Sequence, residues 1–146
     1  MNRDNTLHKV LEHMARILRY MSASCSVPYG SHALSRPQTD ILFFVANSVN
    51  GRTVKELASL LNVTSGAITQ FTNDLVNKKL IFREENTEDR RYVSLKLSPF
   101  AKKEFENFKK EYFKNINPIF SELKDIEIQS LLKLISKIDI SQQKSK

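Results

Sequence analysis

The chain has 146 residues, 40% of them hydrophobic and 27% charged, which suits one domain with its own core. Lys and Arg number 23 against 16 Asp and Glu, and the net charge of +7 favours a polyanionic partner. No run of about 18 apolar residues occurs, which excludes a membrane span, and the charged N-terminus does not resemble a signal peptide. The single cysteine, Cys25, cannot form an internal disulfide, so we expect a cytoplasmic protein.

The first predicted element is a helix over residues 7–21. Its apolar residues recur three and four positions apart and share one face: Leu7, Val10, Leu11, Met14, Ile17, Leu18 and Met21. The segment 22–32 is Ser-rich and contains one Pro and one Gly, which is typical of a loop.

The second helix begins after Ser35, where Pro37 and Gln38 complete a capping box with proline in the first turn. Its buried side holds Ile41, Leu42, Phe44 and Val45. The pair Asn50-Gly51 predicts a turn that ends the helix.

Two short helices follow. Thr53 and Glu56 form a second capping box, and Thr64 caps the next helix after a turn of about three residues. The apolar positions expected inside are Leu57, Ala58, Leu60, Leu61, Ala67, Ile68, Phe71, Leu75 and Val76. This spacing predicts a helix-turn-helix.

After the second of these helices, the apolar residues recur at every second position, which is the period of a β-strand. Residues 80–83 and 92–97 predict two strands, the second with Val93, Leu95 and Leu97 on one face, and the polar segment between them predicts a hairpin with a charged tip.

Ser98 and Pro99 predict the start of a long helix, which Pro118 kinks or ends. Its apolar stripe is Ala101, Phe105, Phe108, Tyr112, Ile116 and Phe120. A final helix opens near Asp125 with Ile128, Leu131, Leu132, Ile135 and Ile138 on one side.

Three segments carry a family likeness: LSRPQTDIL, TVKELASLLNVTSGAITQFTNDLVNKKLIFR and EDRRYVSLKLS. The last holds an Asp-x-Arg wing signature as Asp89-Arg90-Arg91. On these segments the chain resembles the MarR family of bacterial transcriptional regulators. The resemblance implies a mainly α fold with a small β-hairpin wing, in which a winged helix-turn-helix DNA-binding domain (34–98) lies between N-terminal (1–33) and C-terminal (99–146) dimerisation helices.

Two positions depart from the family. Lys79 and Ala101 stand where the family tends to have Gly. A left-handed cap at Lys79 costs roughly 1 kcal/mol relative to Gly, which favours a differently formed cap at this position. Neither change touches an expected DNA contact.

The helix after Thr64 is the expected recognition helix. If its apolar residues face the core, short or amide-bearing residues point outward: Ser65, Gly66, Thr69, Gln70 and Asn73. Gln70 or Asn73 can pair with adenine, and Thr69 can touch a thymine methyl or a phosphate. Gly66 lets the backbone approach a phosphate. The alternative is an ordinary solvent-exposed helix face.

The hairpin tip carries Arg83, Arg90 and Arg91, and an arginine there can enter a narrow minor groove. The resemblance assigns this role to Arg91, with Asp89 orienting the hairpin by pairing to an arginine. The alternative is a solvated charged turn. Residues 52–96 hold eight Lys and Arg against six Asp and Glu, a net charge of only +2, so phosphate binding depends on individual side chains. Contacts to the DNA phosphate backbone are expected from residues at the helix starts: Arg36, Gln38, Thr53, Lys55 and Thr64.

The resemblance implies a homodimer that binds a pseudo-palindromic operator, with double-stranded DNA as partner and repression as the expected outcome. In the family a small aromatic or phenolic effector binds between the dimer helices and the winged helix. The expected lining here is Tyr20, Tyr29, His32, Phe43 and Phe44, although aromatic residues at such places also serve as plain core.

Two alternatives stay open. The chain could be a winged-helix protein-interaction module (an anti-repressor), or Cys25 could act as a thiol redox sensor, although no second cysteine can resolve a sulfenate. The histidines show no convincing metal spacing, and no cofactor is expected. No catalytic constellation stands out, so we expect no enzyme.

Overall fold

The computed structural model describes residues 2–23, 29 and 32–140. The elements in chain order are α1 (Arg3–Ala23), α2 (Arg36–Ala46), α3 (Val54–Leu61), α4 (Ser65–Asn77), β1 (Ile81–Glu85), β2 (Val93–Leu97), α5 (Pro99–Ile116), the short 3-10 helix η1 (Asn117–Phe120) and α6 (Asp125–Ile135). The predicted fold class, mainly helical with one β-hairpin, is confirmed.

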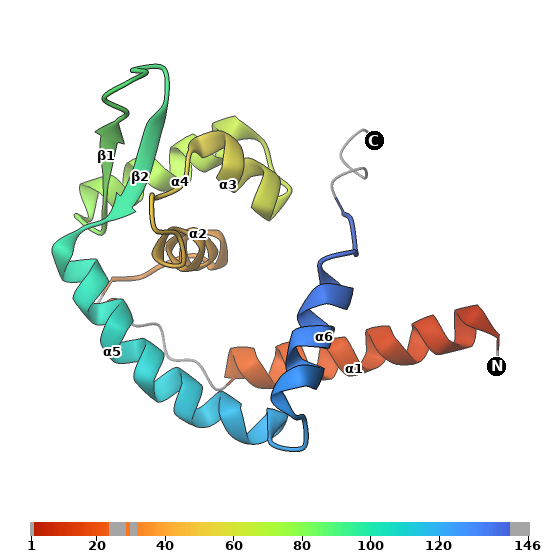
Figure 1. Cartoon of the computed structure of the whole chain (residues 1–146). Coiled ribbons are helices and arrows are strands. Elements are labelled where there is room, and N and C mark those ends of the chain that lie inside the picture. The colour runs from red at the N-terminus through yellow and green to blue at the C-terminus, as the bar shows by residue number, and fades with distance from the viewer. Residues whose placement is uncertain (1, 24–28, 30–31, 141–146) are drawn as a thin grey trace.

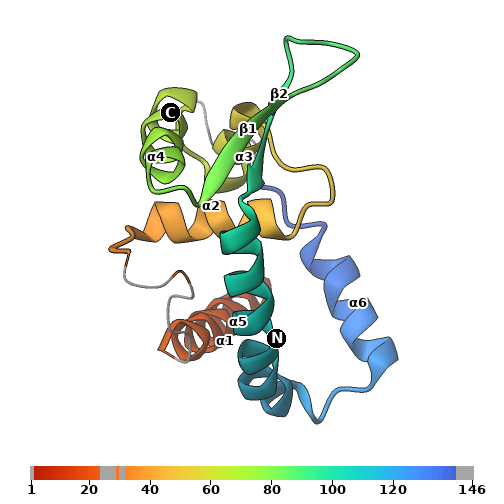
Figure 2. The same ribbon diagram turned by 90° about the vertical axis from the view of Figure 1, so that its left-hand side faces the viewer.

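Helices α2, α3 and α4 and the hairpin share one hydrophobic core. Its buried side chains come from each of these elements, from the start of α5 and from the segment before α2: Tyr29, Ile41, Leu42, Val45, Leu57, Ala58, Ile68, Leu75, Leu80, Ile81, Leu95, Ala101 and Phe105. The hairpin projects beyond the three helices, as Figures 1 and 2 show. The core therefore fixes α4 and the root of the hairpin as one unit.

The helix starts follow the predicted caps. Ser35 Oγ accepts from the Gln38 amide at 3.4 Å, and Gln38 Oε1 accepts from the Ser35 amide at 3.0 Å, so this capping box is complete. The box at Thr53 is only half formed: Thr53 Oγ1 accepts from the Glu56 amide, but the Glu56 carboxylate lies 3.8 Å from Arg52 instead. The remaining predicted side-chain caps are formed by Thr64 and Ser98.

Helix α2 ends at Ala46, earlier than the turn pair Asn50-Gly51 predicted. Asn47 closes the helix, since its side-chain amide donates to the Phe43 carbonyl at 2.9 Å. Gly51 then adopts φ +77°, and a Cβ built there would lie 2.6 Å from the Leu95 carbonyl oxygen. The glycine is therefore required by the close approach of this loop to β2.

The expectation of a different cap at Lys79 is wrong. Lys79 adopts the left-handed conformation at φ +59°. Its amide donates to the Val76 carbonyl, and the Leu80 amide donates to the Leu75 carbonyl, which together make a complete Schellman motif. Leu75 and Leu80 are both fully buried, and apolar burial at this helix end accompanies the motif and offsets the strain at Lys79.

The hairpin is antiparallel, and its register pairs Ile81 with Leu97 and Arg83 with Leu95. Both strands differ slightly from the prediction, because Leu80 belongs to the helix cap and Tyr92 to the tip. A third segment joins the sheet, since Arg52 exchanges two backbone hydrogen bonds with Leu95, at 3.0 and 2.7 Å. The wing is thereby tied to the start of α3.

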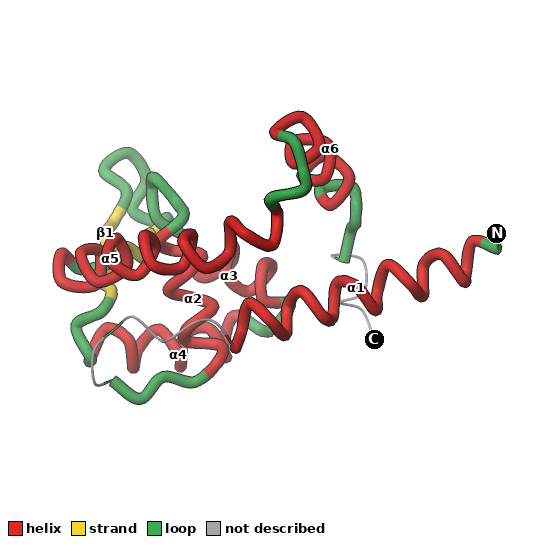
Figure 3. The backbone as a smooth tube through the Cα atoms, turned by 90° about the horizontal axis from the view of Figure 1, so that it is seen from below, coloured by secondary structure: helices red, strands yellow, loops and turns green. Residues whose placement is uncertain are grey.

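The terminal helices stand apart from this core. Helices α1 and α6 contain no buried residue in the single chain, and Figures 1 and 3 show α1 extending away from the winged helix. Helix α5 buries Ala101, Phe105 and Ile116, and it gives way to η1 at Asn117, where Pro118 was predicted to kink or end it. Helices α1 and α6 therefore contribute no buried side chain to the core of the winged helix. Within the described residues, no helix is long and apolar enough to cross a membrane.

Candidate nucleic-acid interface

The outward face of α4 is polar. The five residues predicted to face away from the core are all exposed: Ser65, Gly66, Thr69, Gln70 and Asn73. Ile68, Thr72 and Leu75 form its fully buried side. Phe71, which the sequence predicts on this side, is partly buried and packs against the core, whereas the buried position of Thr72 was not predicted. Thr72 is accommodated there because its hydroxyl donates to the Thr69 carbonyl at 3.1 Å, so no unpaired hydroxyl is buried.

The first turn of α4 leaves room for a ligand's phosphate. A Cβ on Gly66 would meet its nearest neighbouring atom, Thr64 Oγ1, only at 4.0 Å, so the backbone at Gly66 is open to solvent. Thr64 Oγ1 accepts from the Ala67 amide at 3.1 Å. A hydroxyl that accepts in a cap keeps its own O–H, so Thr64 and, at the start of α3, Thr53 can each still donate to a phosphate oxygen.

The tip of the hairpin is a closed turn. Asn86 Oδ1 accepts from the amides of Glu88 and Asp89 at 2.8 and 3.3 Å, and the Asn86 amide donates to the Tyr92 carbonyl at 2.9 Å. The Tyr92 amide donates in turn to the Asp89 carbonyl at 3.1 Å. These bonds give the exposed tip a defined shape.

Asp89 binds Arg91 at this tip. Arg91 donates from Nη2 to Asp89 Oδ2 at 2.7 Å and from Nε to Asp89 Oδ1 at 3.0 Å, while its backbone amide donates to Asp89 Oδ1 at 3.1 Å. The side-chain bonds to Arg91, followed by the backbone bond, hold the pKa of Asp89 below its usual range. The carboxylate in turn raises the pKa of Arg91. The Arg91 side chain remains 86% exposed, so the pair orients the guanidinium without burying it.

The other two wing arginines differ in their surroundings. Arg90 is exposed on the tip. Arg83 lies in β1, and its Nη2 donates to the side-chain oxygen of Asn73 on α4. This contact joins the first wing strand to the recognition helix on one continuous surface.

The side chain of Gln38 points into the protein and binds other residues of the chain. Its side chain is buried, with Nε2 donating to Asp74 Oδ2 at 2.5 Å and Oε1 accepting from the Ser35 amide. Lys78 donates to the same Asp74 oxygen at 2.7 Å and to the Ala33 carbonyl at 3.2 Å. The bonds from Lys78, then from Gln38, hold the pKa of Asp74 below its usual range. We therefore assign Gln38 to the framework that supports α4 and leave it out of the proposed interface.

The role of Asp74 was not predicted from the sequence, because Asp74 is not among the outward residues of α4 that the helical period identifies. The single indication in the sequence is its spacing of four from Lys78, which brings the two side chains together on a helix. Arg36, the other expected contact at the start of α2, is exposed and pairs with Asp40 at 3.2 Å. Lys55, in the first turn of α3, is exposed.

The five expected effector residues lie in different environments. Tyr20 and Phe43 are about half exposed, whereas Phe44 and His32 are partly buried. The rings of Phe43 and Phe44 meet edge to face, with centroids 5.7 Å apart. Tyr29 is 2% exposed, burial raises its pKa, and its hydroxyl has no hydrogen-bond partner in the part of the chain that the structure describes. Cys25, the candidate redox residue, lies outside the described residues.

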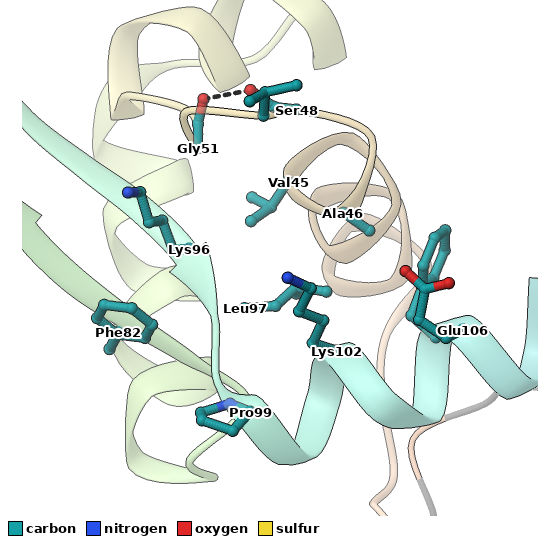
Figure 4. A pocket seen from close by; sticks show the side chains of 12 residues that line it. Val45, Ala46, Ser48, Gly51, Phe82, Lys96, Leu97, Pro99, Lys102 and Glu106 are labelled. Carbon is teal, nitrogen blue, oxygen red and sulfur yellow. Dashed lines mark hydrogen bonds between the residues drawn. The ribbon is translucent and has the colours of Figure 1, made fainter.

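A hollow of about 520 Å³ lies between the end of α2, the root of the hairpin and the start of α5 (Figure 4). It is lined by Val45, Ala46, Ser48, Val49, Gly51, Phe82, Lys96, Leu97, Pro99, Lys102, Phe105 and Glu106. None of the five expected effector residues is part of this lining. In the described part of the chain, no three His, Cys, Asp or Glu side chains are grouped so that they could hold a metal ion.

These features define a winged helix-turn-helix protein. They are a helix-turn-helix, an antiparallel hairpin that follows it and is tied to its recognition helix, and flanking helices whose apolar faces are not buried. A family model described as "MarR family" matches residues 33–91. The chain belongs to the MarR family, whose members are DNA-binding transcriptional regulators.

Two curated relatives from Bacillus subtilis (strain 168) are similar to most of the chain. The uncharacterized HTH-type transcriptional regulator YpoP is 30% identical over 106 residues, which cover 73% of this chain and 74% of YpoP. The HTH-type transcriptional repressor YetL is 27% identical over 108 residues, covering 73% of this chain and 65% of YetL. Among solved structures, the transcriptional regulator BldR from Sulfolobus Solfataricus superposes with a TM-score of 0.66 at 23% identity, covering 94% of this chain and all of BldR (100%).

Proposed function

We propose that this MarR-type regulator is a repressor that binds a pseudo-palindromic operator as a homodimer and is released by a small aromatic or phenolic effector. The observation that carries the proposal is the hydrogen bond from Arg83 to Asn73, which joins the polar outward face of α4 to the first strand of the wing. The proposed division of the chain is 1–33 and 99–146 for dimerisation and 34–98 for DNA binding. Its action is binding rather than catalysis, in the cytoplasm.

The proposed reading surface is the outward face of α4, from its N-terminus to Asn73, in the major groove. Gln70 and Thr69 reach base edges, while Ser65, Gly66 and Thr64 hold a phosphate against the helix N-terminus. Arg36, Lys55 and Thr53 make further backbone contacts. These contacts are sequence-independent and fix the register of the helix on the duplex.

The proposed role of the wing is to place Arg91 in the minor groove beside the operator half-site. Asp89 presents the guanidinium in one orientation while leaving it exposed. Nη1 and the second N–H of Nη2 remain available for base or phosphate oxygens, because a guanidinium has five N–H donors. Arg90 is proposed as the neighbouring phosphate contact.

The proposed dimer is supported by the apolar side chains that a single chain leaves in water. On α1 these include Leu7, Val10, Leu11, Ile17 and Leu18, and on and after α6 they include Ile126, Leu132, Leu134, Ile135 and Ile138. Exposed apolar faces of this size on monomers mark interaction sites, and a second copy offers the same faces by symmetry. The similarity to YetL, an HTH-type transcriptional repressor, supports the sign of regulation proposed here.

The test of the dimer uses Leu132→Glu, since Leu132 is 67% exposed and the change leaves the winged-helix core untouched. We expect sedimentation to show a monomer and binding to a full operator to fall to that of a half-site. Lys133→Glu, one position away on α6, is the matched control and stays dimeric. An unchanged dimer of Leu132→Glu, or full operator affinity from a monomer, would contradict the proposal.

The effector proposal is supported by the hydroxyl of Tyr29. Among the described residues this buried hydroxyl has no hydrogen-bond partner. An unpaired buried hydroxyl is unfavourable by about 1–3 kcal/mol, and a bound ligand with a polar group would satisfy it. Thermal-shift measurements with a set of phenols and aromatic acids test this. We expect at least one to raise the melting temperature of the wild type and weaken operator binding, and Tyr29→Phe to abolish the shift. No shift from any compound, or an equal shift in Tyr29→Phe, would contradict the role.

A further inference from the structure

The contact between Arg83 and Asn73 follows from the register of the hairpin. Arg83 lies opposite Leu95, so these two side chains share one face of the two-stranded sheet. Leu95 is buried in the core, and that face is therefore the one turned toward the helices. Arg83 reaches past the core to the exposed edge of α4, where its Nη2 donates to Asn73 Oδ1.

The chemistry of Arg83 fixes how the Asn73 amide is turned. A guanidinium only donates hydrogen bonds, so the atom of Asn73 that faces it must be the carbonyl oxygen. The NH₂ group of Asn73 then lies on the other side of the amide, away from Arg83. Both residues are exposed, so this orientation is presented at the surface of the recognition helix.

This orientation conflicts with reading adenine. A bidentate pair with adenine needs the amide oxygen to accept from N6 while the amide nitrogen donates to N7. In this chain the oxygen is bound to a cation, and a second donor approaching it would meet the positive charge of Arg83. The groups that remain are all donors: the NH₂ of Asn73 and the free N–H groups of Arg83.

We propose that Asn73 and Arg83 act as one donor unit that selects guanine, rather than adenine, at one position of each operator half-site. Guanine presents two acceptors in the major groove, N7 and O6, whereas adenine presents a donor beside its N7. The inference rests on the proposed function, because it requires α4 to lie in the major groove. The inference adds the identity of one base, guanine, to the proposed function. It also places Arg83, a residue of strand β1, among the residues that determine specificity.

Gln70 provides an internal comparison. It lies three residues before Asn73 on the same exposed face, and no side-chain hydrogen bond of Gln70 is present among the described residues. Its amide keeps both a donor and an acceptor for a base. Gln70 therefore reads a different position from the donor unit, and that position is free to be adenine.

The test is selection of binding sites from a randomised duplex library by the full chain, followed by sequencing. We compare wild type with Asn73→Ala, Arg83→Ala, Arg83→Lys and Gln70→Ala, after circular dichroism confirms that each variant is folded. We expect wild type to enrich a pseudo-palindrome with guanine at one position of each half-site. Asn73→Ala and Arg83→Ala should both lose the base preference at that same position. Arg83→Ala frees the Asn73 oxygen, so the ratio of guanine to adenine should fall about tenfold.

Arg83→Lys separates base reading from simple charge. It keeps the positive charge for phosphate but has no planar fork, so we expect affinity to be largely retained while the guanine preference falls. Gln70→Ala should alter another position and leave this one unchanged. The inference would be overturned if the position that depends on Asn73 prefers adenine, or if no position depends on Asn73. It would also be overturned if Asn73→Ala and Arg83→Ala change the preference at two different positions. If wild type enriches no sequence, the proposed function itself fails, which is a distinguishable result.

Discussion

Gln38, in the first turn of α2, donates from Nε2 to Asp74 Oδ2 in the recognition helix at 2.5 Å. The same carboxylate oxygen accepts from Lys78, which also donates to the Ala33 carbonyl. The segment before α2, the start of α2 and the end of α4 are thereby held together by one carboxylate. This group of bonds links α4 to the start of α2, and none of its members is among the five outward residues of α4.

Replacing Gln38 by Ala removes this tie and one half of the α2 capping box. We expect the free energy of unfolding, measured with urea, to fall by about 1 kcal/mol, because a buried hydrogen-bonded side chain is lost. Gln70→Ala is the matched control on the exposed face of α4. It should change stability by less than about 0.5 kcal/mol and act on DNA affinity instead. Equal stabilities of the two variants would contradict the framework role of Gln38.

Lys79→Gly should stabilise the protein. Lys79 is left-handed at φ +59°, a conformation that disfavours residues with a Cβ, and its side chain is exposed. We expect the free energy of unfolding to rise by about 0.5–1 kcal/mol, since the relief of strain exceeds the entropy that Gly adds to the unfolded chain. Asn77→Gly, in the last regular turn of α4, is the control and should destabilise by up to about 1 kcal/mol. A loss of stability in Lys79→Gly would show that no strain is stored there.

Two of the glycines should respond oppositely to alanine. Gly51→Ala should lower the free energy of unfolding by more than about 1 kcal/mol, because φ is +77° and the added Cβ would meet the Leu95 carbonyl at 2.6 Å. Gly66→Ala sits in a helix with open space around it and should raise stability by about 0.5–1 kcal/mol. Gly66→Ala should nevertheless weaken DNA binding if its backbone approaches a phosphate. Thermal unfolding and operator affinity, measured on both variants, check the two effects separately.

The Asp89–Arg91 pair predicts a pH effect confined to the wing tip. Because Arg91 lowers the pKa of Asp89, the pair stabilises the tip above the unfolded-state pKa of about 3.9, and this contribution is lost as the pH falls through the lower folded-state pKa. Carboxyl-carbon NMR titration should give Asp89 a pKa below that of an unperturbed Asp. Arg91→Ala should move the value upward, and Arg90→Ala should not. An Asp89 pKa that is the same in wild type and Arg91→Ala would contradict the pairing.

Much of the fold could be predicted from local sequence. Side-chain caps at Ser35, Thr53, Thr64 and Ser98 begin their helices as expected, because a cap depends on residues within one turn. The outward face of α4 was also predictable, since the helical period fixes which residues lie opposite the core.

What local reasoning missed depends on contacts between distant residues. The side chain of Gln38 is buried because it binds Asp74, which lies 36 positions away in the sequence. The cap at Lys79 is maintained because Leu80 is buried in a core that other elements form. The half-formed box at Thr53 reflects competition by Arg52 for Glu56, and Arg52 itself is positioned by its bridge to Leu95. Propensity and spacing describe one element at a time and do not report such partners.

The measurement that tests the central claim most directly is fluorescence anisotropy of the protein with its own upstream DNA and with a scrambled duplex, over a series of salt concentrations. We predict selective binding to the upstream DNA, with an affinity that falls steeply as salt rises. Arg91→Ala should weaken binding to both duplexes and reduce the salt slope by about 1, whereas Gln70→Ala should reduce the preference between the duplexes. Equal affinity of wild type for the two duplexes, or variants that bind as wild type does, would contradict a regulator that reads DNA with α4 and the wing.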